Sequence, residues 1–175
     1  MLETKRTFIR PINQEDAKAV FNYRSDSKTN QFQGWIPKTL EDVNEFIYKN
    51  PAEFNVPETW FQLVIIETNS DKIIGDIGVH FSDERNLQCE IGCTLNKAYQ
   101  KKGFASETLQ AVIDHLFTRL EKHRVFASLD PKNESSVNLM ERLGFRKEAH
   151  FKRSLWFRGK WVDDLVFAIL KSEWK

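Results

Sequence analysis

Apolar residues recur at intervals of three or four positions in four segments of the chain, which is the spacing of amphipathic helices. The clearest pattern predicts a helix over residues 104–120. Five apolar residues share one face of it: Leu109, Val112, Ile113, Leu116 and Phe117. Three further helices are predicted over residues 14–24, 40–49 and 134–143. Asn13, the box Thr39-Leu40-Glu41-Asp42 and the stop at Gly144 supply the signals for their ends.

Elsewhere the pattern changes to short apolar runs that are separated by polar turns, as in strands. The predicted strands cover residues 7–12, 61–68, 72–81, 88–95, 124–129, 151–157 and 161–170. Helices and strands in this order predict an α+β fold, with a mixed, mostly antiparallel central sheet flanked by helices. The length of 175 residues, without an internal repeat or linker, predicts a single domain over residues 1–175.

Charge and composition narrow the class of protein. The 26 Lys and Arg residues balance 25 Asp and Glu residues, so the formal net charge is +1. A dedicated nucleic-acid-binding protein has a strongly basic footprint, and we therefore expect no nucleic-acid partner. No apolar run approaches the roughly 20 residues that cross a bilayer. The N-terminal residues also lack the apolar core of a signal peptide, so we expect a cytoplasmic protein without a membrane partner.

The two cysteines, Cys89 and Cys93, fall in one predicted strand. Four residues of strand separate their Cα atoms by about 13 Å, whereas a disulfide needs less than about 7 Å. The same separation argues against a shared metal site, and the four histidines show no metal-ligand spacing. We expect free thiols, which suit a reducing compartment, and no metal.

A strand, a short loop and a long helix follow one another at the strongest candidate site. Strand 88–95 leads through Gln100-Lys101-Lys102-Gly103-Phe104-Ala105 into helix 104–120. Free N–H groups at a helix N-terminus attract anions, and Lys97, Lys101 and Lys102 add positive charge. Gly103 and Ala105 let a ligand approach the backbone. The loop is neither a Walker A sequence nor a dinucleotide fingerprint, and by itself it leaves a purely steric role for Gly103 equally open.

The same six residues match the Gln/Arg-x-x-Gly-x-Gly/Ala motif of the GNAT acetyltransferases. About thirty residues later, Asn133-x-x-Ser136 leads to Leu143-Gly144-Phe145, which resembles the second signature of that superfamily. Near the end, Gly159-x-Trp161-x-Asp163 and Leu170-x-x-Glu173-Trp174 resemble its RimJ/RimL branch, which includes N-terminal acetyltransferases of ribosomal proteins. The resemblance covers nearly the whole chain from Thr7 onward.

The resemblance implies acetyl-CoA as co-substrate, held between splayed strands. N–H groups over residues 101–106 would bind the diphosphate, and strand residues 92–95 would pair with the pantetheine arm as an added strand. The implied cofactor-binding residues are Cys93, Thr94, Leu95, Gln100, Lys101, Lys102, Gly103, Phe104, Ala105, Ser106 and Asn133. Asn133 would hydrogen-bond the arm near its thioester; a second interpretation makes it a helix-capping or turn residue.

The implied activity is transfer of an acetyl group to a primary amine by direct attack in a ternary complex. A protein or peptide N-terminal α-amine is the leading acceptor. The alternatives are a small amine, such as a polyamine or an antibiotic, and a non-catalytic acyl-CoA-binding module.

Two residues are candidates for proton transfer. Glu90 shares a strand face with Gly92 and Thr94 and is the candidate base, with a solvated strand carboxylate as the alternative. Many GNAT enzymes place a Tyr acid seven residues after the Asn, but here that position is Met140, which cannot donate a proton. Ser136 is the substitute donor, unless its hydroxyl is satisfied locally in the helix.

Aromatic residues in two places invite a structural or a functional interpretation. Phe32 and Trp35 stand in a polar segment, either as a plug over the core or as a wall of the acceptor pocket. Near the end of the chain, Trp156, Phe157, Trp161 and Phe167 are predicted to form the core of a hairpin. An interface of a homodimer would explain this aromatic hairpin as well.

Overall fold

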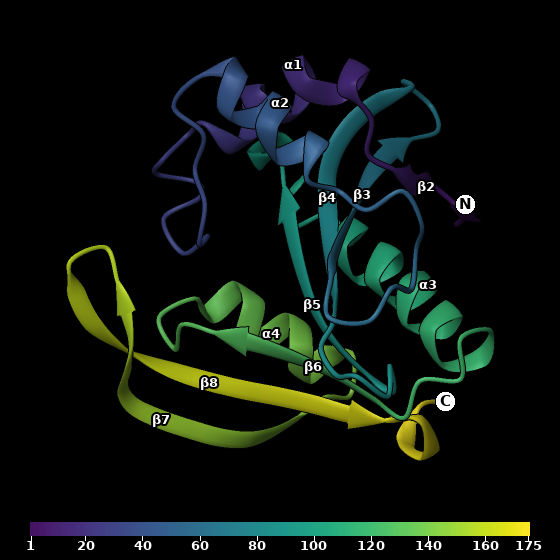
Figure 1. Ribbon diagram of the computed structural model, residues 1–175, viewed down its shortest axis with the longest axis vertical. Helices are drawn as coiled ribbons and strands as arrows, with labels where there is room; N and C mark the ends of the chain where they lie inside the picture. Colours follow the sequence, from purple (N-terminus) through teal and green to yellow (C-terminus); the bar gives the residue numbers. More distant parts are fainter.

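Eight strands and four α-helices make up the fold (Figure 1). The computed structural model describes residues 1–175. The strands are β1 (Leu2–Glu3), β2 (Thr7–Pro11), β3 (Trp60–Glu67), β4 (Lys72–Phe81), β5 (Gln88–Leu95), β6 (Arg124–Leu129), β7 (Arg146–Phe157) and β8 (Lys160–Leu170). The helices are α1 (Ala17–Arg24), α2 (Leu40–Tyr48), α3 (Phe104–Thr118) and α4 (Glu134–Arg142). Short 3₁₀ turns cover Gln14–Asp16, Lys97–Tyr99 and Lys171–Glu173.

All strands belong to one sheet in the order β1-β2-β3-β4-β5-β6-β8-β7. Neighbours are antiparallel except β5 and β6, which are parallel. The predicted α+β class with a mostly antiparallel sheet is therefore confirmed. No helix is both long enough and apolar enough to cross a membrane.

Most elements lie where the hydrophobic pattern predicts them, and strand β5 has the predicted ends. The differences occur where the apolar signal is weak. Strand β7 begins at Arg146, five residues before the predicted start. The hydrophobic pattern does not reveal these first residues, because most of them are polar and exposed. The two-residue β1 carries no pattern of its own. Thr39 forms the predicted capping box with Asp42, and Asn13 is an N-cap as predicted, at the 3₁₀ turn that precedes α1.

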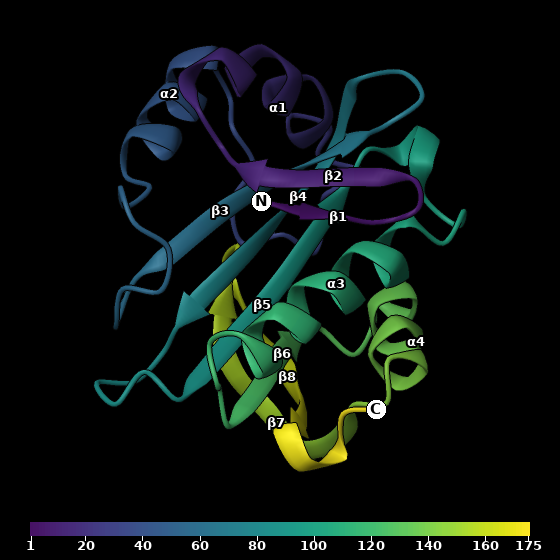
Figure 2. The ribbon, with the colours of Figure 1, turned by 90° about the vertical axis from the view of Figure 1, so that its right-hand side faces the viewer.

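Helices cover both faces of the central strands (Figure 2). In β3, Leu63 and Ile65 pack in the larger core with α3, whereas Val64 and Ile66 pack in a second core with α1 and α2. Successive strand residues point to opposite faces, so a strand between two layers is apolar throughout. The five predicted residues of the α3 stripe are all buried in the larger core.

A buried polar cluster ties helix α1 to strand β4. The carboxylate of Asp76 accepts hydrogen bonds from the Tyr23 hydroxyl at 2.6 Å and from Arg24 Nε at 2.8 Å, and it is ion-paired with the Arg24 guanidinium. All three side chains are buried. A buried charge without a partner is costly, so this cluster favours one placement of α1 on the sheet.

The sheet opens between its two parallel strands. β5 pairs with β6 only through residues 88–90 and 124–126. Beyond Glu90, β5 and β6 diverge, and the remaining edge of β5 faces an opening instead of a neighbouring strand (Figure 1). This opening places the end of β5 beside the N-termini of α3 and α4.

The C-terminal hairpin of β7 and β8 projects from the rest of the molecule (Figure 1). Phe167 is buried as predicted, and Phe157 is partly buried. The prediction of a hairpin core is wrong for Trp156 and Trp161, which are 59% and 58% exposed. These two rings pack edge to face near the turn, where no helix covers the two-stranded ribbon.

Candidate functional site

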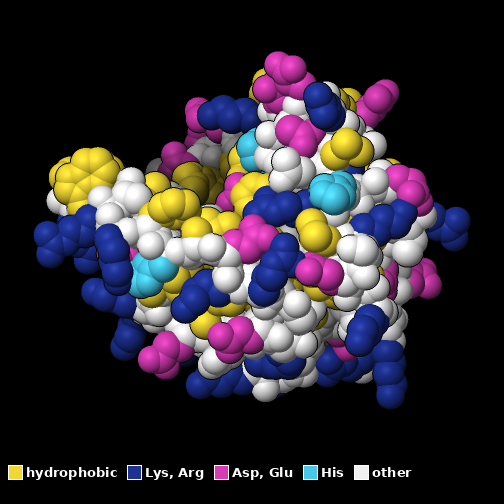
Figure 3. All heavy atoms as spheres, turned by 90° about the horizontal axis from the view of Figure 1, so that it is seen from below, with side chains coloured by type: hydrophobic (Ala, Val, Ile, Leu, Met, Phe, Trp, Pro, Cys, Tyr) yellow, Lys and Arg dark blue, Asp and Glu magenta, His cyan; other side chains and the backbone are white.

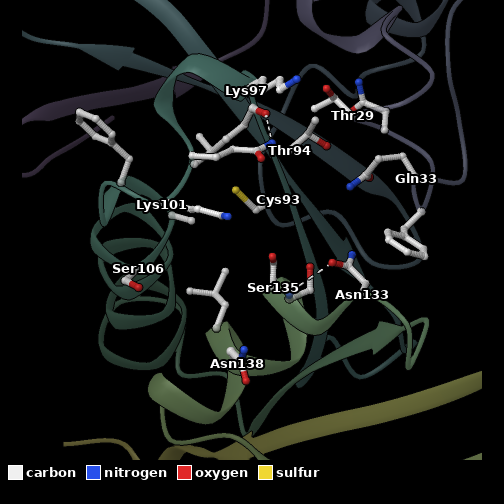
Figure 4. A pocket seen from close by; sticks show the side chains of 18 of the residues that line it. Thr29, Gln33, Cys93, Thr94, Lys97, Lys101, Ser106, Asn133, Ser135 and Asn138 are labelled. Atoms are coloured by element: carbon white, nitrogen blue, oxygen red, sulfur yellow. Dashed lines mark hydrogen bonds between the residues drawn. The ribbon is translucent and has the colours of Figure 1, made fainter.

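A cavity of about 710 Å³ lies at the opening of the sheet. It is bounded by the end of β5, the loop that precedes α3, the first turns of α4 and a loop over residues 28–33 (Figure 4). The residues that line it are Lys28, Thr29, Asn30, Gln31, Phe32, Gln33, Cys93, Thr94, Leu95, Lys97, Gln100, Lys101, Gly103, Phe104, Ala105, Ser106, Asn133, Ser135, Ser136, Asn138, Leu139 and Arg142.

The loop before α3 makes a sharp turn into the N-terminus of that helix. Lys101 and Gly103 both have a left-handed backbone, with φ angles of 60° and 84°. This geometry turns the chain sharply into α3, whose first N–H groups have no partner within the helix. Gln100 Nε2 donates a hydrogen bond of 2.9 Å to the Leu95 carbonyl and so ties the loop to the end of β5.

The N-terminal segment braces the same loop from outside. Arg6 Nη1 donates to the Lys102 carbonyl at 3.0 Å, and the guanidinium lies 4.3 Å from the centre of the Phe104 ring. Arg6 is also paired with Glu107 of α3 at 2.6 Å. A Cβ atom at Gly103 would meet Arg6 Nη2 at 3.3 Å, so a side chain there would press against this brace.

The lining of the cavity is positively charged. Lys28, Lys97, Lys101 and Arg142 line it, and none of its residues is acidic. Free helix N–H groups, a left-handed glycine turn and four cations together fit a diphosphate. The unpaired edge of β5 beside it fits an extended chain that carries amide groups.

Ten of the eleven predicted cofactor-binding residues line this cavity. Lys102 is the exception: its carbonyl is bound by Arg6, and its ammonium lies 5.6 Å from the centre of the Tyr99 ring. Phe104 lines the cavity at the loop, and its side chain is buried in the core. The structure therefore brings together the predicted strand, loop and helix residues around one space.

Asn133 and Ser136 lie on the opposite wall of the cavity, at the start of α4. Asn133 is the N-cap of this helix, and its side-chain oxygen accepts from the Ser136 N–H at 3.3 Å. The capping interpretation is therefore correct, while the amide nitrogen makes no hydrogen bond within the chain and stays available to a ligand. The Ser136 hydroxyl also has no hydrogen-bond partner in the chain, whereas Met140 is buried in the core.

Cys93 points into the middle of the cavity, between Thr94 and Ser135 (Figure 4). Burial, together with the nearby carboxylate of Asp76, raises the pKa of its thiol to about 12. Almost no thiolate is therefore present near neutral pH. Cys93 contributes shape to this cavity and is a weak nucleophile.

Glu90 lies outside this cavity, farther back along β5. Its carboxylate is 3.9 Å from His80 Nδ1 of the neighbouring strand, and the His80 ring stacks on Trp60 at 4.8 Å. Burial and the charge of Asp164 raise the pKa of Glu90, while burial lowers the pKa of His80. A carboxylate with a raised pKa and a neutral imidazole are both suited to accept a proton near neutral pH.

Two glycines pair across neighbouring strands beside Glu90. Gly78 of β4 is directly opposite Gly92 of β5, and a Cβ atom at Gly92 would meet nothing within 4 Å. Next to this pair lies Gln62, whose buried side-chain oxygen has no hydrogen-bond partner. Open space therefore lies over Gly92, whereas the Gln62 side chain covers Gly78, where a Cβ atom would meet Gln62 Nε2 at 3.1 Å.

The two aromatic residues of the 25–37 loop have different surroundings. Phe32 lines the cavity at β5, whereas Trp35 stacks on Phe46 of α2 at 4.4 Å and packs against the second core. Phe32 therefore fits the interpretation as a wall of a pocket, and Trp35 fits the interpretation as a plug over the core. Gln31 and Phe32 also line a second cavity of about 710 Å³, next to the C-terminal hairpin.

Sequence reasoning missed several residues of the first cavity. The loop at 28–33 shows no motif, and only the fold carries it to the site. On α4, Ser135, Asn138, Leu139 and Arg142 line the wall. Their spacing from one another was a usable signal, because helix residues three or four positions apart share a face.

A family model described as an acetyltransferase (GNAT) domain matches residues 6–146. The chain is 34% identical to an uncharacterized N-acetyltransferase, YnaD, of Bacillus subtilis, and the match covers 99% of this chain and 98% of that protein. It is 25% identical to the ribosomal protein uS5-alanine N-acetyltransferase of Escherichia coli, over 99% of this chain and 92% of that protein.

Solved structures show the same architecture. The crystal structure of a GNAT-family acetyltransferase from Bacillus anthracis superposes with a TM-score of 0.89 at 30% identity, over 98% of this chain and 99% of that one. A spermidine N-acetyltransferase from Vibrio cholerae, in complex with CoA and spermine, superposes with a TM-score of 0.82 at 20% identity, over 95% and 96% of the two chains. At that identity the second likeness extends to the fold alone.

Proposed function

The chain belongs to the GNAT family of acetyltransferases, and we propose that its acceptor is the N-terminal α-amine of a protein or peptide. Members of this family are N-acetyltransferases that use acetyl-CoA. The cavity at the start of α3 fits that co-substrate through its anion-binding loop and its four cations. The identity of the acceptor is the part that we infer.

Acetyl-CoA supplies an activated acetyl thioester, and the residues of the chain prepare the amine. An α-amine has a pKa near 8, so it needs less help to lose a proton than a lysine side chain with a pKa near 10.4. Glu90 is our candidate base, acting through a water molecule in the open space over Gly92. N–H groups at the open end of β5 would stabilise the negative charge that develops on the carbonyl oxygen.

Ser136 is our candidate donor to the leaving sulfur. Its hydroxyl lines the cavity and has no partner in the chain. A thiolate is a good leaving group, so a hydrogen bond from Ser136 would assist without being indispensable. Cys93, with its raised pKa, favours direct attack by the amine over an acetyl-cysteine route.

The single observation that carries the choice of acceptor is the second cavity. Gln31 and Phe32 line both this cavity and the first one, and its lining reaches Trp161 near the tip of the hairpin. The peptide that follows an N-terminal amine could therefore lie along this second cavity. Its lining includes four cationic residues and only two carboxylates, which disfavours a polyamine acceptor by like-charge repulsion.

The test is an assay of free thiol release from acetyl-CoA with three groups of amines. The groups are peptides with a free N-terminus, polyamines, and aminoglycoside antibiotics. We expect the highest kcat/KM for peptides and no turnover of the same peptides after N-terminal blocking. Faster turnover of spermidine than of any peptide would overturn the acceptor assignment. CoA binding without thiol release would identify a binding module.

Two further expectations belong to this proposal. We propose a single catalytic domain over the described residues, because one sheet carries both cavities. We also propose a cytoplasmic protein, in agreement with the free thiols of Cys89 and Cys93.

A further inference from the structure

The second cavity carries an excess of positive charge at the tip of the hairpin. Figure 3, seen from below, shows Lys and Arg side chains beside the hydrophobic side chains at the far left, where the hairpin ends. The charged residues that line the cavity are Asp130, Lys132, Arg153, Arg158, Lys160 and Asp163. Because the whole chain has a formal net charge of only +1, this excess is local.

Three of the four cations have no partner in the chain. Lys132 and Arg153 use only their backbone N–H groups in hydrogen bonds to side chains, and the Lys160 ammonium contacts no carboxylate. Arg158 is the exception. It donates to the Gln33 carbonyl at 3.0 Å and so links the hairpin to the loop that both cavities share.

The two carboxylates of the lining are already engaged. Asp163 accepts from the Arg153 N–H at 3.0 Å and from Lys152 Nζ at 3.0 Å, and His150 Nε2 lies 2.8 Å away. These partners, the Arg153 N–H first, lower the pKa of Asp163. Asp130 accepts from the Lys132 N–H at 2.8 Å. Four cations against two carboxylates leave the lining with an excess of two positive charges.

Asp163 also shapes the hairpin. The register of β7 and β8 shifts between Phe151 and Leu155, and Arg153 has a left-handed backbone with a φ of 47°. Its N–H bond to Asp163 holds this irregularity in place. Bulges of this kind re-aim side chains, and here Arg153 lines the cavity.

From these contacts we propose that the acceptor is a polypeptide N-terminus with Asp or Glu among its first few residues, bound by Lys132, Arg153 and Lys160. The inference rests on the proposed function. The two cavities share Gln31 and Phe32, and an extended peptide advances about 3.4 Å per residue, so a peptide whose amine lies in the first cavity would place its next side chains in the second. Trp161, with Trp156 packed against it, offers an apolar wall to the intervening residues. A small amine would leave this cavity empty.

The experiment compares three peptides that begin with the same residue and carry Glu, Gln or Lys at their second to fourth positions. At low ionic strength we expect kcat/KM to be about tenfold higher for the Glu peptide than for the Gln peptide, and lower still for the Lys peptide. Added salt should narrow these ratios, because the charges lie near the surface.

Matched variants locate the effect. In the triple variant Lys132→Gln, Arg153→Gln and Lys160→Gln, kcat/KM for the Glu peptide should be nearly equal to kcat/KM for the Gln peptide. The pair Arg153→Glu and Lys160→Glu should invert it in favour of the Lys peptide. Lys18→Gln, Lys49→Gln and Lys147→Gln remove the same charge from exposed positions away from the cavity and should leave the ratio unchanged. Thermal unfolding and CoA binding check that each variant is folded.

The outcomes distinguish failure of the proposed function from failure of the proposed preference for acidic peptides. Absence of thiol release with every peptide would overturn the proposed function and this inference with it. Release without preference for acidic peptides would overturn the inference alone. So would a higher kcat/KM for free glutamate than for any peptide, or a dimer in sedimentation that dissociates when Trp156 and Trp161 are changed to Ser.

Discussion

Gln100 Nε2 donates a hydrogen bond to the carbonyl oxygen of Leu95, at 2.9 Å, across the turn that joins strand β5 to the anion-binding loop. The first residue of the loop motif therefore has a structural role, because it fixes the distance between the end of the strand and the N-terminus of α3. Both ends of this bond line the first cavity. Loss of the bond would loosen the loop without removing any group that touches a phosphate.

We expect Gln100→Ala to weaken CoA binding by about three- to tenfold, which corresponds to the loss of one hydrogen bond of about 1 kcal/mol. The midpoint of thermal unfolding should change little, because the loop is at the surface. Calorimetric titration with CoA measures the first quantity. An unchanged dissociation constant would remove Gln100 from the site.

Gly103→Glu should abolish CoA binding. The left-handed φ of 84° disfavours any side chain, the new Cβ atom would press on Arg6, and the carboxylate would repel a diphosphate. The control is Gly159→Glu, which makes the same change at a φ of 79°, in open space at the hairpin turn. We expect that variant to bind CoA normally. Equal loss in both variants would point to the fold instead of the site.

Glu90→Gln should lower kcat chiefly in the pH range between the pKa of Glu90 and that of the acceptor amine, and leave CoA affinity unchanged. A base must be deprotonated to act, and the raised pKa of Glu90 moves the acid limb of the wild-type profile upward from the range of an ordinary carboxylate. At high pH the acceptor amine is already neutral, so the two enzymes should converge. Glu84→Gln, at an exposed turn position, serves as the control. Identical profiles for wild type and Glu90→Gln would dismiss this base.

Ser136→Ala should lower kcat by about tenfold, as expected for one hydrogen bond to a leaving group of about 1.4 kcal/mol. The neighbouring Ser135→Ala should have a smaller effect, since the sequence aligns Ser136 with the second family signature. Steady-state rates at saturating acetyl-CoA give the comparison. If the Ser136 variant retains the full rate, water protonates the sulfur.

Cys93→Ala should retain kcat within about threefold and still show kinetics of a ternary complex. With a thiol pKa of about 12, about one molecule in ten thousand carries a thiolate at pH 8, too few for a covalent route. Mass spectrometry of the wild-type enzyme with acetyl-CoA alone should find no acetylated Cys93. An acetyl adduct there, together with loss of activity in the variant, would contradict direct attack.

The sequence by itself determined most of the elements and the strand, loop and helix residues on one side of the first cavity. The stripe on α3, the apolar run of β3 and the caps at Asn13 and Thr39 are local patterns, and the loop from Gln100 to Ala105 is contiguous. Chain neighbours stay close in any fold, so the residues of one strand, loop and helix N-terminus could be assigned together.

Only the tertiary structure decided which distant segments complete the first cavity and line the second. The 28–33 loop reaches the cavity because α1 is fastened to β4 by Arg24 and Asp76, and the hairpin meets that loop through Arg158 and Gln33. Trp35 and Phe32, three residues apart, ended in different surroundings, and Trp156 and Trp161 were left uncovered. Contacts between distant segments depend on how layers pack and where a sheet splays, and no local spacing of residues records either.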